Sequence, residues 1–262
     1  MYEQHRTFTA AGPIQLGIRN DSGSVEVTTS DGNEIEVTVS PGNRGDRAER
    51  TAQETKVAFD DNVLVVKVPK QRFNSDDLDI TVVVPHDSTA TIRTASANVS
   101  CQGRLAGLEV DTASGSIDAQ QVTGDAKAKS ASGSVEIDSV GGAARLTSAS
   151  GDLRVGSIAE GQLETASGSI SVGRAAGSVR ANTASGDIEI GSLAGPARID
   201  GVSGDIRIGL AAGLAAKLEV TSLTGDIQSE LPVDDQAPVE GSPVEVSSHT
   251  VSGDITIHRA TV

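Results

Sequence analysis

The chain has 262 residues, with 29 glycines, three phenylalanines, one tyrosine and no tryptophan. A core without large aromatic side chains must be built from aliphatic residues, and thin cores of small and β-branched residues are typical of stacked β-structures. The formal net charge of −15 argues against general nucleic-acid binding, because proteins that bind DNA or RNA present a basic surface.

The first 90 residues contain short segments in which apolar and polar residues alternate, as in strands with one buried face. These segments cover residues 14–18, 25–28, 35–39, 63–68 and 78–84. The polar stretch 42–55 between them is expected to be a loop with room for a short helix. We predict that residues 1–90 form a β-rich N-terminal cap that continues directly into the region that follows.

One phrase recurs from residue 94 onward: a small residue, then Ala-Ser-Gly, then Ser or Asp, then an aliphatic residue. Its glycines are spaced 18, 18, 17, 18 and 18 residues apart, at Gly115, Gly133, Gly151, Gly168, Gly186 and Gly204. A second set lies about halfway between them, at Gly124, Gly142, Gly161, Gly177 and Gly195. Looser copies occur at 224–227 and 251–255. Such a period is the signature of a repeat architecture.

Each half of the repeat is a turn followed by a short alternating segment, which predicts a strand with one buried face. The inward aliphatic residues that follow the glycines are Ile117, Val135, Leu153, Ile170, Ile188 and Ile206. Two such strands and their turns form one unit, here termed a rung, which buries its inward face only by stacking on the next. Residues 91–262 are therefore predicted to form a single-stranded β-solenoid (parallel β-helix) with rungs of about 18 residues. An antiparallel sandwich, also all-β, does not require this repeat.

The repeat loosens near the C-terminus. Residues 229–249 contain three prolines and several acidic residues, which predicts a loop inserted into the repeat region. The chain then returns for a last strand at 254–258. The sequence has no stretch approaching eighteen apolar residues and begins without a basic segment followed by an apolar run, so we expect a cytoplasmic protein with no membrane span.

The recurring phrase, together with the apolar segment 64–70 and the segment 80–85 before it, resembles a family of bacterial proteins known as "putative adhesins". The resemblance covers nearly the whole chain. It implies a β-solenoid fold and a domain of unknown function without established catalytic residues. The adhesin name is a weak guide to function, because one fold can serve many functions.

A calcium site is the first candidate. Asp187, Asp205 and Asp226 take equivalent positions in the repeated phrase, and stacked carboxylates about 5 Å apart would repel each other unless a cation bound between them. The alternative interpretation is that these side chains cap the turns by accepting backbone N–H groups. The sequence favours capping, because the double-glycine pattern of calcium-binding nine-residue repeats is absent and serine often replaces the acid.

A basic stripe is the second candidate. The outward positions of the second strand of each rung give Lys127, Arg145, Arg180 and Arg198, with Glu164 predicted to interrupt the row. Such a row could bind an anionic polymer. The alternative is a solvated face, which the net charge and the lack of interleaved aromatic residues favour.

Catalysis finds little support. Polysaccharide cleavage needs paired carboxylates across a groove, and the regular repeats show no irregular acidic cluster. The four histidines are scattered, and no phosphate-binding loop, dinucleotide fingerprint or nucleophile motif occurs. Because Cys101 is the single cysteine, the chain can form neither an internal disulfide nor a cysteine-based zinc site. Cys101 is expected to be a small core residue.

The sequence thus predicts a non-enzymatic structural or protein-interaction scaffold without a cofactor. Its expected partner is an unidentified protein or a second copy of the chain that associates through the caps. The alternative is a ligand-binding solenoid for calcium or an anionic polymer.

Overall fold

The computed structural model describes residues 3–43, 45–70, 76–231 and 243–260. Over these residues the regular elements are β-strands and one helix, as the all-β prediction requires. Tertiary contacts divide the chain into two compact units, residues 1–138 and 139–262, and each is described by itself.

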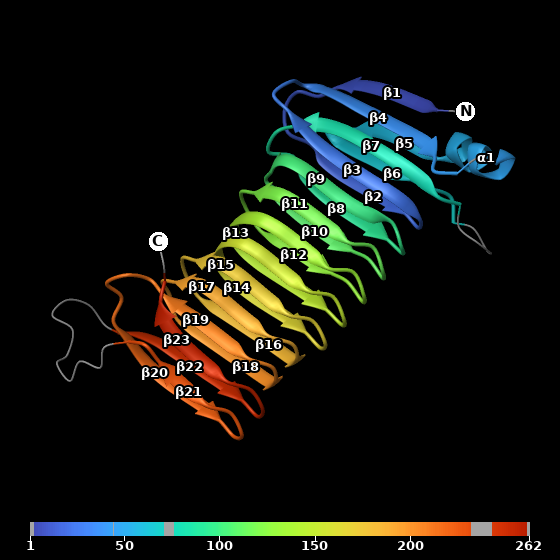
Figure 1. Cartoon of the computed structure of the whole chain (residues 1–262). Coiled ribbons are helices and arrows are strands. Elements are labelled where there is room, and N and C mark those ends of the chain that lie inside the picture. The colour runs from blue at the N-terminus through green and yellow to red at the C-terminus, as the bar shows by residue number, and fades with distance from the viewer. Residues whose placement is uncertain (1–2, 44, 71–75, 232–242, 261–262) are drawn as a thin grey trace. The chain divides into compact units, whose positions relative to one another are not determined.

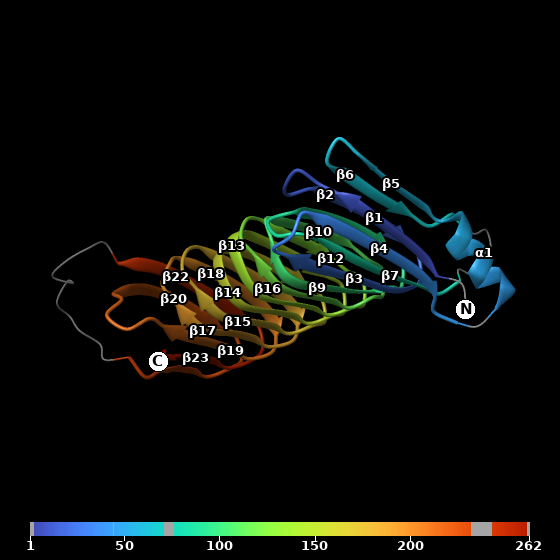
Figure 2. The same ribbon diagram turned by 90° about the horizontal axis from the view of Figure 1, so that it is seen from above.

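The parallel strands of the first unit lie in two layers (Figures 1 and 2). One layer consists of β6 (Val63–Lys67), β2 (Gln15–Asn20), β8 (Thr89–Thr94), β10 (Gly107–Asp111) and β12 (Ala126–Lys129), paired in that order. The other consists of β7 (Leu78–Pro85), β3 (Gly23–Ser30), β9 (Asn98–Leu105), β11 (Ile117–Val122) and the first residues of β13 (Val135–Ser148). Each rung of this unit therefore contributes one strand to each layer.

The N-terminal end of the first unit changes from parallel to antiparallel pairing. β4 (Glu34–Pro41) pairs antiparallel with β7, β1 (Gln4–Thr9) pairs antiparallel with β4, and β5 (Lys56–Asp60) pairs antiparallel with β6. Helix α1 (Asp46–Glu54) lies in the stretch predicted as a loop with a short helix, contacts β4 and buries Ala48, Thr51 and Ala52.

The second unit repeats the two-layer arrangement (Figure 1). Strand β14 (Leu153–Thr165) bends from one layer into the other, because its first half pairs with β15 (Ile170–Ala175) and its second half with β16 (Val179–Ser185). From there one layer continues through β17 (Ile188–Leu193), β19 (Ile206–Leu210), β23 (Ile255–Arg259) and β21 (Ile227–Ser229). The other continues through β18 (Ala197–Ser203), β22 (Val244–Thr250) and β20 (Ala216–Ser222).

The core of the second unit is a set of aliphatic columns between the layers. Ile170 pairs with Ile188, and Ile188 with Ile206, so the partners are 18 residues apart as the repeat predicts. Leu153 and Ile255 extend the same column on either side, and all five side chains are buried; Ile227, the next partner beyond Ile255, is exposed. In the first unit the buried Val99 and Ile117 pair in the same way. The predicted alternation of buried and exposed residues is confirmed.

The order of strands in space departs from the order in the chain at both ends. In the first unit, β2 and β3 lie between the rung of β6 and β7 and the rung of β8 and β9. In the second unit, β22 and β23 lie between the rung of β18 and β19 and the rung of β20 and β21. Strands β2 and β3 near one end of the chain, and β22 and β23 near the other, are thus enclosed between rungs that lie nearer the middle of the sequence.

The repeated phrase forms the turn between the two layers. A hydroxyl three residues before the glycine accepts the glycine N–H, as between Gly133 and Ser130 (2.8 Å) and between Gly225 and Ser222 (2.9 Å). At Gly204, φ is +130°, and a Cβ would collide with the carbonyl oxygen of Gly186 on the neighbouring rung. Glycine recurs here because neighbouring turns approach each other so closely.

Two predicted boundaries differ from the elements observed. The end of the predicted cap, near residue 90, falls within β8 and inside the first compact unit. The predicted inserted loop 229–249 includes residues 232–242, which lie outside the described residues, but β22 already begins at Val244. The sequence there has polar residues at most inward positions, so the aliphatic alternation that marks the other strands is weak.

Candidate functional site

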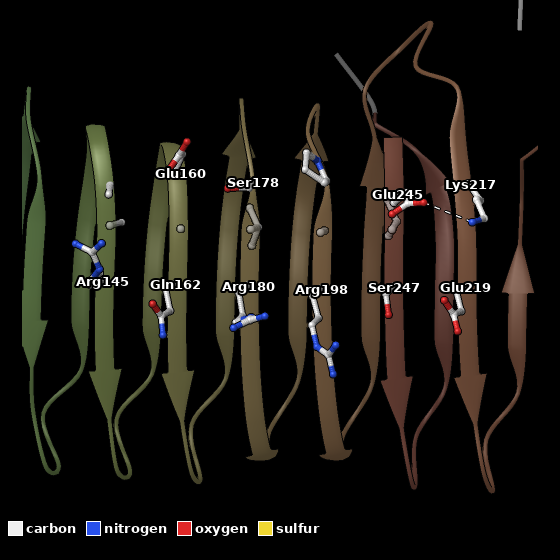
Figure 3. A pocket seen from close by; sticks show the side chains of 17 residues that line it. Arg145, Glu160, Gln162, Ser178, Arg180, Arg198, Lys217, Glu219, Glu245 and Ser247 are labelled. Carbon is white, nitrogen blue, oxygen red and sulfur yellow. Dashed lines mark hydrogen bonds and ion pairs between the residues drawn. The ribbon is translucent and has the colours of Figure 1, made fainter. Parts of the chain in front are cut away.

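A groove of about 540 Å³ runs across the outward face of one layer of the second unit. Its floor is formed by parts of β13, β14, β16, β18, β22 and β20, and Figure 3 shows its labelled side chains projecting from adjacent strands. It is lined by Arg145, Glu160, Gln162, Arg180, Arg198, Lys217, Glu219 and Glu245, among others. Three of the four residues predicted to form a basic stripe therefore lie in one groove.

The arginines occupy one row because the parallel register holds them there. Gln162 pairs with Arg180, and Arg180 with Arg198. The same row continues through Ser247 and then Glu219. Arg145 lies at the same level of the row in Figure 3. Strand spacing places successive side chains about 4.8 Å apart along this row.

The prediction that Glu164 interrupts the row is wrong. Glu164 pairs with Asn182, which pairs with Asp200, so it belongs to the neighbouring row. The neutral Gln162 takes the place between Arg145 and Arg180. The residue of β14 that lies in the arginine row is therefore two positions earlier than predicted. The reason is that Gly161, the register partner of Val179, lacks the aliphatic side chain that marks the start of the inward pattern in other strands.

The arginines of the groove differ in their local partners. Arg198 donates from Nε to a carboxylate oxygen of Asp200 at 2.9 Å. Arg145 and Arg180 have no ion-pair or hydrogen-bond partner for their side chains among the described residues. Like charges that face each other across strands are destabilising, so the row of Arg180 and Arg198 is a place where a bound anion would lower the electrostatic energy.

Acidic side chains also line the groove. Lys217 lies 3.4 Å from Glu245 near β20, and Glu160 on β14 and Glu219 on β20 have no side-chain ion pair or hydrogen bond among the described residues. The surface is thus basic along the arginine row and mixed towards β20. A ligand that matches it would carry negative charge over a short length only.

Lys127, the fourth residue of the predicted stripe, lies in the first unit on β12. Its Nζ lies 2.8 Å from Glu109 on β10, and this hydrogen bond raises the pKa of Lys127 and lowers the pKa of Glu109. Nearby, Arg93 lies 3.7 Å from Asp111. Lys127 is therefore engaged within its own sheet, in contrast to Arg145 and Arg180.

The predicted acidic positions form a ladder of turn caps. The Asp205 N–H donates to Asp187 at 2.9 Å, and the Asp254 N–H donates to Asp205 at 3.0 Å. The Asp226 N–H then donates to Asp254 at 2.8 Å. Asp205 and Asp226 are therefore not neighbours, because the inserted rung places Asp254 between them. The turn-capping interpretation accounts for the carboxylates of Asp187, Asp205 and Asp254, whereas Asp226, at the end of the ladder, takes part through its backbone N–H.

Metal ligands do not converge in the part of the chain that the structure describes. No group of three or more His, Cys, Asp or Glu side chains is arranged there to hold a metal ion. Asp187, Asp205 and Asp254 each direct one carboxylate oxygen to a backbone N–H of the next rung rather than to a shared point. The ladder is accounted for without a cation.

Cys101 is buried on β9, as expected for a small core residue. Burial, with a smaller effect of the Asp118 carboxylate, raises the pKa of its thiol to about 12. A thiol with so high a pKa stays protonated near neutral pH and is a poor nucleophile.

Comparison with known proteins gives a family assignment. The family model described as "Toastrack DUF4097" matches residues 14–260. The chain belongs to the Toastrack family. This agrees with the resemblance that the recurring phrase carries, and none of the curated proteins matches the chain in sequence.

Solved structures similar to this Toastrack protein include three from bacteria of the genera Bacteroides and Parabacteroides. A "putative adhesin" from Bacteroides fragilis is 17% identical, with 98% of this chain and 97% of that chain covered and a TM-score of 0.42. A "putative adhesin" from Parabacteroides merdae is 13% identical, with coverage of 97% and 95% and a TM-score of 0.42. A "putative lipid binding protein" from Parabacteroides distasonis is 14% identical, with coverage of 99% and 97% and the same TM-score.

In this Toastrack chain the sequence predicts the arginines of the groove but not the charged residues at its β20 end. Lys217, Glu219 and Glu245 come together only because β22 lies between β18 and β20. No described helix is long and apolar enough to cross a membrane.

Proposed function

We propose that the protein is a non-enzymatic, adhesin-like interaction scaffold that binds an acidic segment of a partner protein in the arginine-lined groove. The proposal includes a single-stranded β-solenoid of about 18-residue rungs as the supporting scaffold. The observation on which the proposal rests is the row of Arg145, Arg180 and Arg198, with the neutral Gln162 between the first two; Arg145 and Arg180 have no ion-pair partner among the described residues.

The mixed charge of the groove favours a protein segment over an anionic polymer. Glu160, Glu219 and Glu245 lie beside the arginines and would repel a chain that carries negative charge at every step. A peptide can instead place its acidic residues over the arginines and its neutral or basic residues over the glutamates. Complementarity of this kind gives specificity at an interface.

The lining residues also support a binding role over catalysis. Among the described residues that line the groove there is no histidine or cysteine, the commonest general base and the strongest nucleophile of enzymes. Lys217 and Glu245 are paired with each other across adjacent strands.

The proposal predicts that a labelled peptide of alternating glutamate and serine binds the full chain and that the double variant Arg145→Gln/Arg180→Gln binds it about tenfold more weakly. The reason is the loss of two charge-assisted contacts. Fluorescence anisotropy at several salt concentrations measures the affinity, which should fall as salt rises because the groove is open to solvent.

The control is Arg154→Gln/Arg207→Gln, which removes the same charge from the outward face of the other layer, where both arginines pair with nearby aspartates. This variant should bind the peptide as the unmodified chain does. Equal weakening by both variants would show that only net charge matters and would contradict the proposal. Preference for heparin over the peptide would assign the groove to an anionic polymer instead.

A further inference from the structure

Strand β20 forms the open end of one layer of the second unit. It pairs with β22 over seven consecutive residues without a bulge, and on its other side it has no partner strand among the described residues. It contains no proline. A regular edge strand of this kind presents a row of free backbone groups to which another strand can add.

The apolar residues of this end are incompletely covered. Leu218 and Val220 on β20 are half-buried, whereas Val246 and Ser248, their register partners on β22, are fully buried. Leu223, just after β20, is 75% exposed. Exposed large hydrophobic residues also include Val202, Ile227 and Val251, which belong to the same three rungs at the C-terminal end. Such a concentration at one end indicates a surface that is covered in the assembled protein.

The backbone groups that face the open edge can be identified. The Val244 N–H donates to the carbonyl of Ala215 at 2.9 Å, which directs the backbone groups of the odd-numbered residues of β20 towards β22. Because these directions alternate along a strand, the N–H and carbonyl groups of Ala216, Leu218 and Val220 point to the open edge. An incoming strand must therefore bond to these even-numbered residues.

We propose that the edge binds a second copy of this chain, with the two β20 strands antiparallel about a two-fold axis at Leu218. This register forms hydrogen-bonded pairs at the even-numbered residues that face the edge. It also places Lys217 opposite Glu219 of the second copy, twice by symmetry. These two positions are non-hydrogen-bonded pairs, in which side chains lie closest together across antiparallel strands.

Charge complementarity distinguishes this register from its alternatives. An axis at Val220 would place Glu219 opposite Thr221, and an axis at Ala216 would place Lys217 opposite Ala215. Neither joins the two charges. Within one copy, Lys217 already lies 3.4 Å from Glu245. In the proposed register, Lys217 of the second copy becomes the ion-pair partner of Glu219, which has no partner among the described residues. The pairing also extends a row of alternating charge.

The dimer goes beyond the proposed groove function and does not depend on the groove's ligand. The test uses charge reversal with the full chain in sedimentation equilibrium. Glu219→Lys and Lys217→Glu each turn two attractive pairs into two repulsive ones. Each pair contributes up to about 1 kcal/mol when attractive and costs up to about 1 kcal/mol when repulsive, so each variant should dimerise about tenfold more weakly or worse. Mixed in equal amounts, the two variants should form a heterodimer, because each supplies the charge that the other now lacks.

A matched control is Glu136→Lys, which makes the same change of charge at an exposed position on the interior strand β13 and should leave the dimer intact. Failure of the mixed variants to associate more tightly than either alone would overturn the register. A chain that stays monomeric in sedimentation across the concentration range would overturn the dimer itself.

A cross-linking experiment tests the axis independently of charge. In the proposed register the two Leu218 Cα atoms lie about 5.5 Å apart, within the range that a disulfide spans. Leu218→Cys should therefore give a covalent dimer on oxidation, while Val246→Cys, the register partner inside the sheet, should not. The natural Cys101 is buried and does not interfere. Absence of the Leu218→Cys cross-link in a sedimenting dimer would place the interface elsewhere and overturn the proposal.

Discussion

The aspartates of the turn ladder combine two opposing effects at single residues. The carboxylates of Asp187, Asp205 and Asp254 each accept a backbone N–H from the aspartate of the next rung, which stabilises the turn but also stacks acidic residues on neighbouring rungs. Exposure to solvent screens the repulsion, so the hydrogen bonds decide the balance. The acidic charge itself is then dispensable, but the acceptor oxygen is not.

This view predicts different results for two substitutions of Asp205. Asp205→Ala removes the acceptor of the Asp254 N–H and should lower the free energy of unfolding by about 1 kcal/mol. Asp205→Asn keeps an acceptor oxygen. It should change the free energy of unfolding by less than about 0.5 kcal/mol, since the ion pair of Asp205 with Arg207, at 3.6 Å, is a weak surface pair. Urea unfolding of both variants measures the difference. Equal destabilisation by both would mean that the charge, not the hydrogen bond, matters.

Cys101 should be unreactive in the folded protein. Its pKa of about 12 keeps the thiol protonated at pH 8, and burial excludes the reagent. Dithiobis(nitrobenzoic acid) should label it only after denaturation, whereas a cysteine at the exposed neighbour, through Gln102→Cys, should react at once. Rapid labelling of the unmodified folded chain would contradict the buried position.

The same residue gives a pH dependence of stability. The unfolded thiol titrates near the ordinary value of 9.0 and the folded thiol near 12, so the unfolded state loses its proton first as the pH rises. The stabilising contribution is complete below pH 9 and falls by up to about 1.4 kcal/mol per pH unit between 9 and 12. Cys101→Ala should flatten that part of the stability curve, even though it lowers stability at neutral pH.

At the scale of elements, the turns set the spacing of the rungs. Gly204 holds φ at +130° and leaves no room for a Cβ against the Gly186 carbonyl. Gly204→Ala should therefore lower the free energy of unfolding by about 3 kcal/mol, through backbone strain and the forced separation of two rungs. Thermal unfolding followed by circular dichroism would detect the loss.

Gly12→Ala is the matched control for that substitution, because nothing lies within 4 Å of a Cβ at Gly12. We expect it to change the free energy of unfolding by about 0.5 kcal/mol or less. Similar losses in the two variants would indicate that glycine is preferred in these turns for a reason other than the close approach of the rungs.

The sequence predicts which face of each strand is buried better than it predicts which strands lie side by side. Alternation fixes which residues of β15, β17 and β19 point inward, because burial of one face demands period two. It does not fix which rung lies beside which, since 224–227 and 251–255 carry the same phrase and the same inward isoleucine. The choice between them depends on packing over whole rungs, so the order β19, β23, β21 could not be predicted.

The candidate site shows the same limit. Arg180 and Arg198 belong to consecutive rungs, and their alignment follows from the repeat alone. Gln162 was missed because a 17-residue spacing and the absence of a side chain at Gly161 hide the start of its strand. Lys217 and Glu245 could not be placed together, since their contact exists only through the inserted strand β22.

At the scale of the whole molecule, the charge of −15 has a consequence for any partner. The surface as a whole repels anions, and the groove attracts them only at short range, because charges farther apart than about 8 Å are largely screened at physiological salt. The groove therefore selects among anionic partners only through groups that lie directly against its arginines. A dimer joined at β20 would bring together two grooves whose mixed-charge ends meet at Lys217 and Glu219.

The enclosed position of the last strands also bears on how the protein is made. Residues 244–259 are synthesised after β20 and β21, yet they lie between that rung and the rung of β18 and β19. The native neighbours of β20 and β21 are therefore available only once residue 259 has left the ribosome. A nascent chain that stalls before residue 244 lacks β22 and β23, so β20 and β21 cannot take their native place in it.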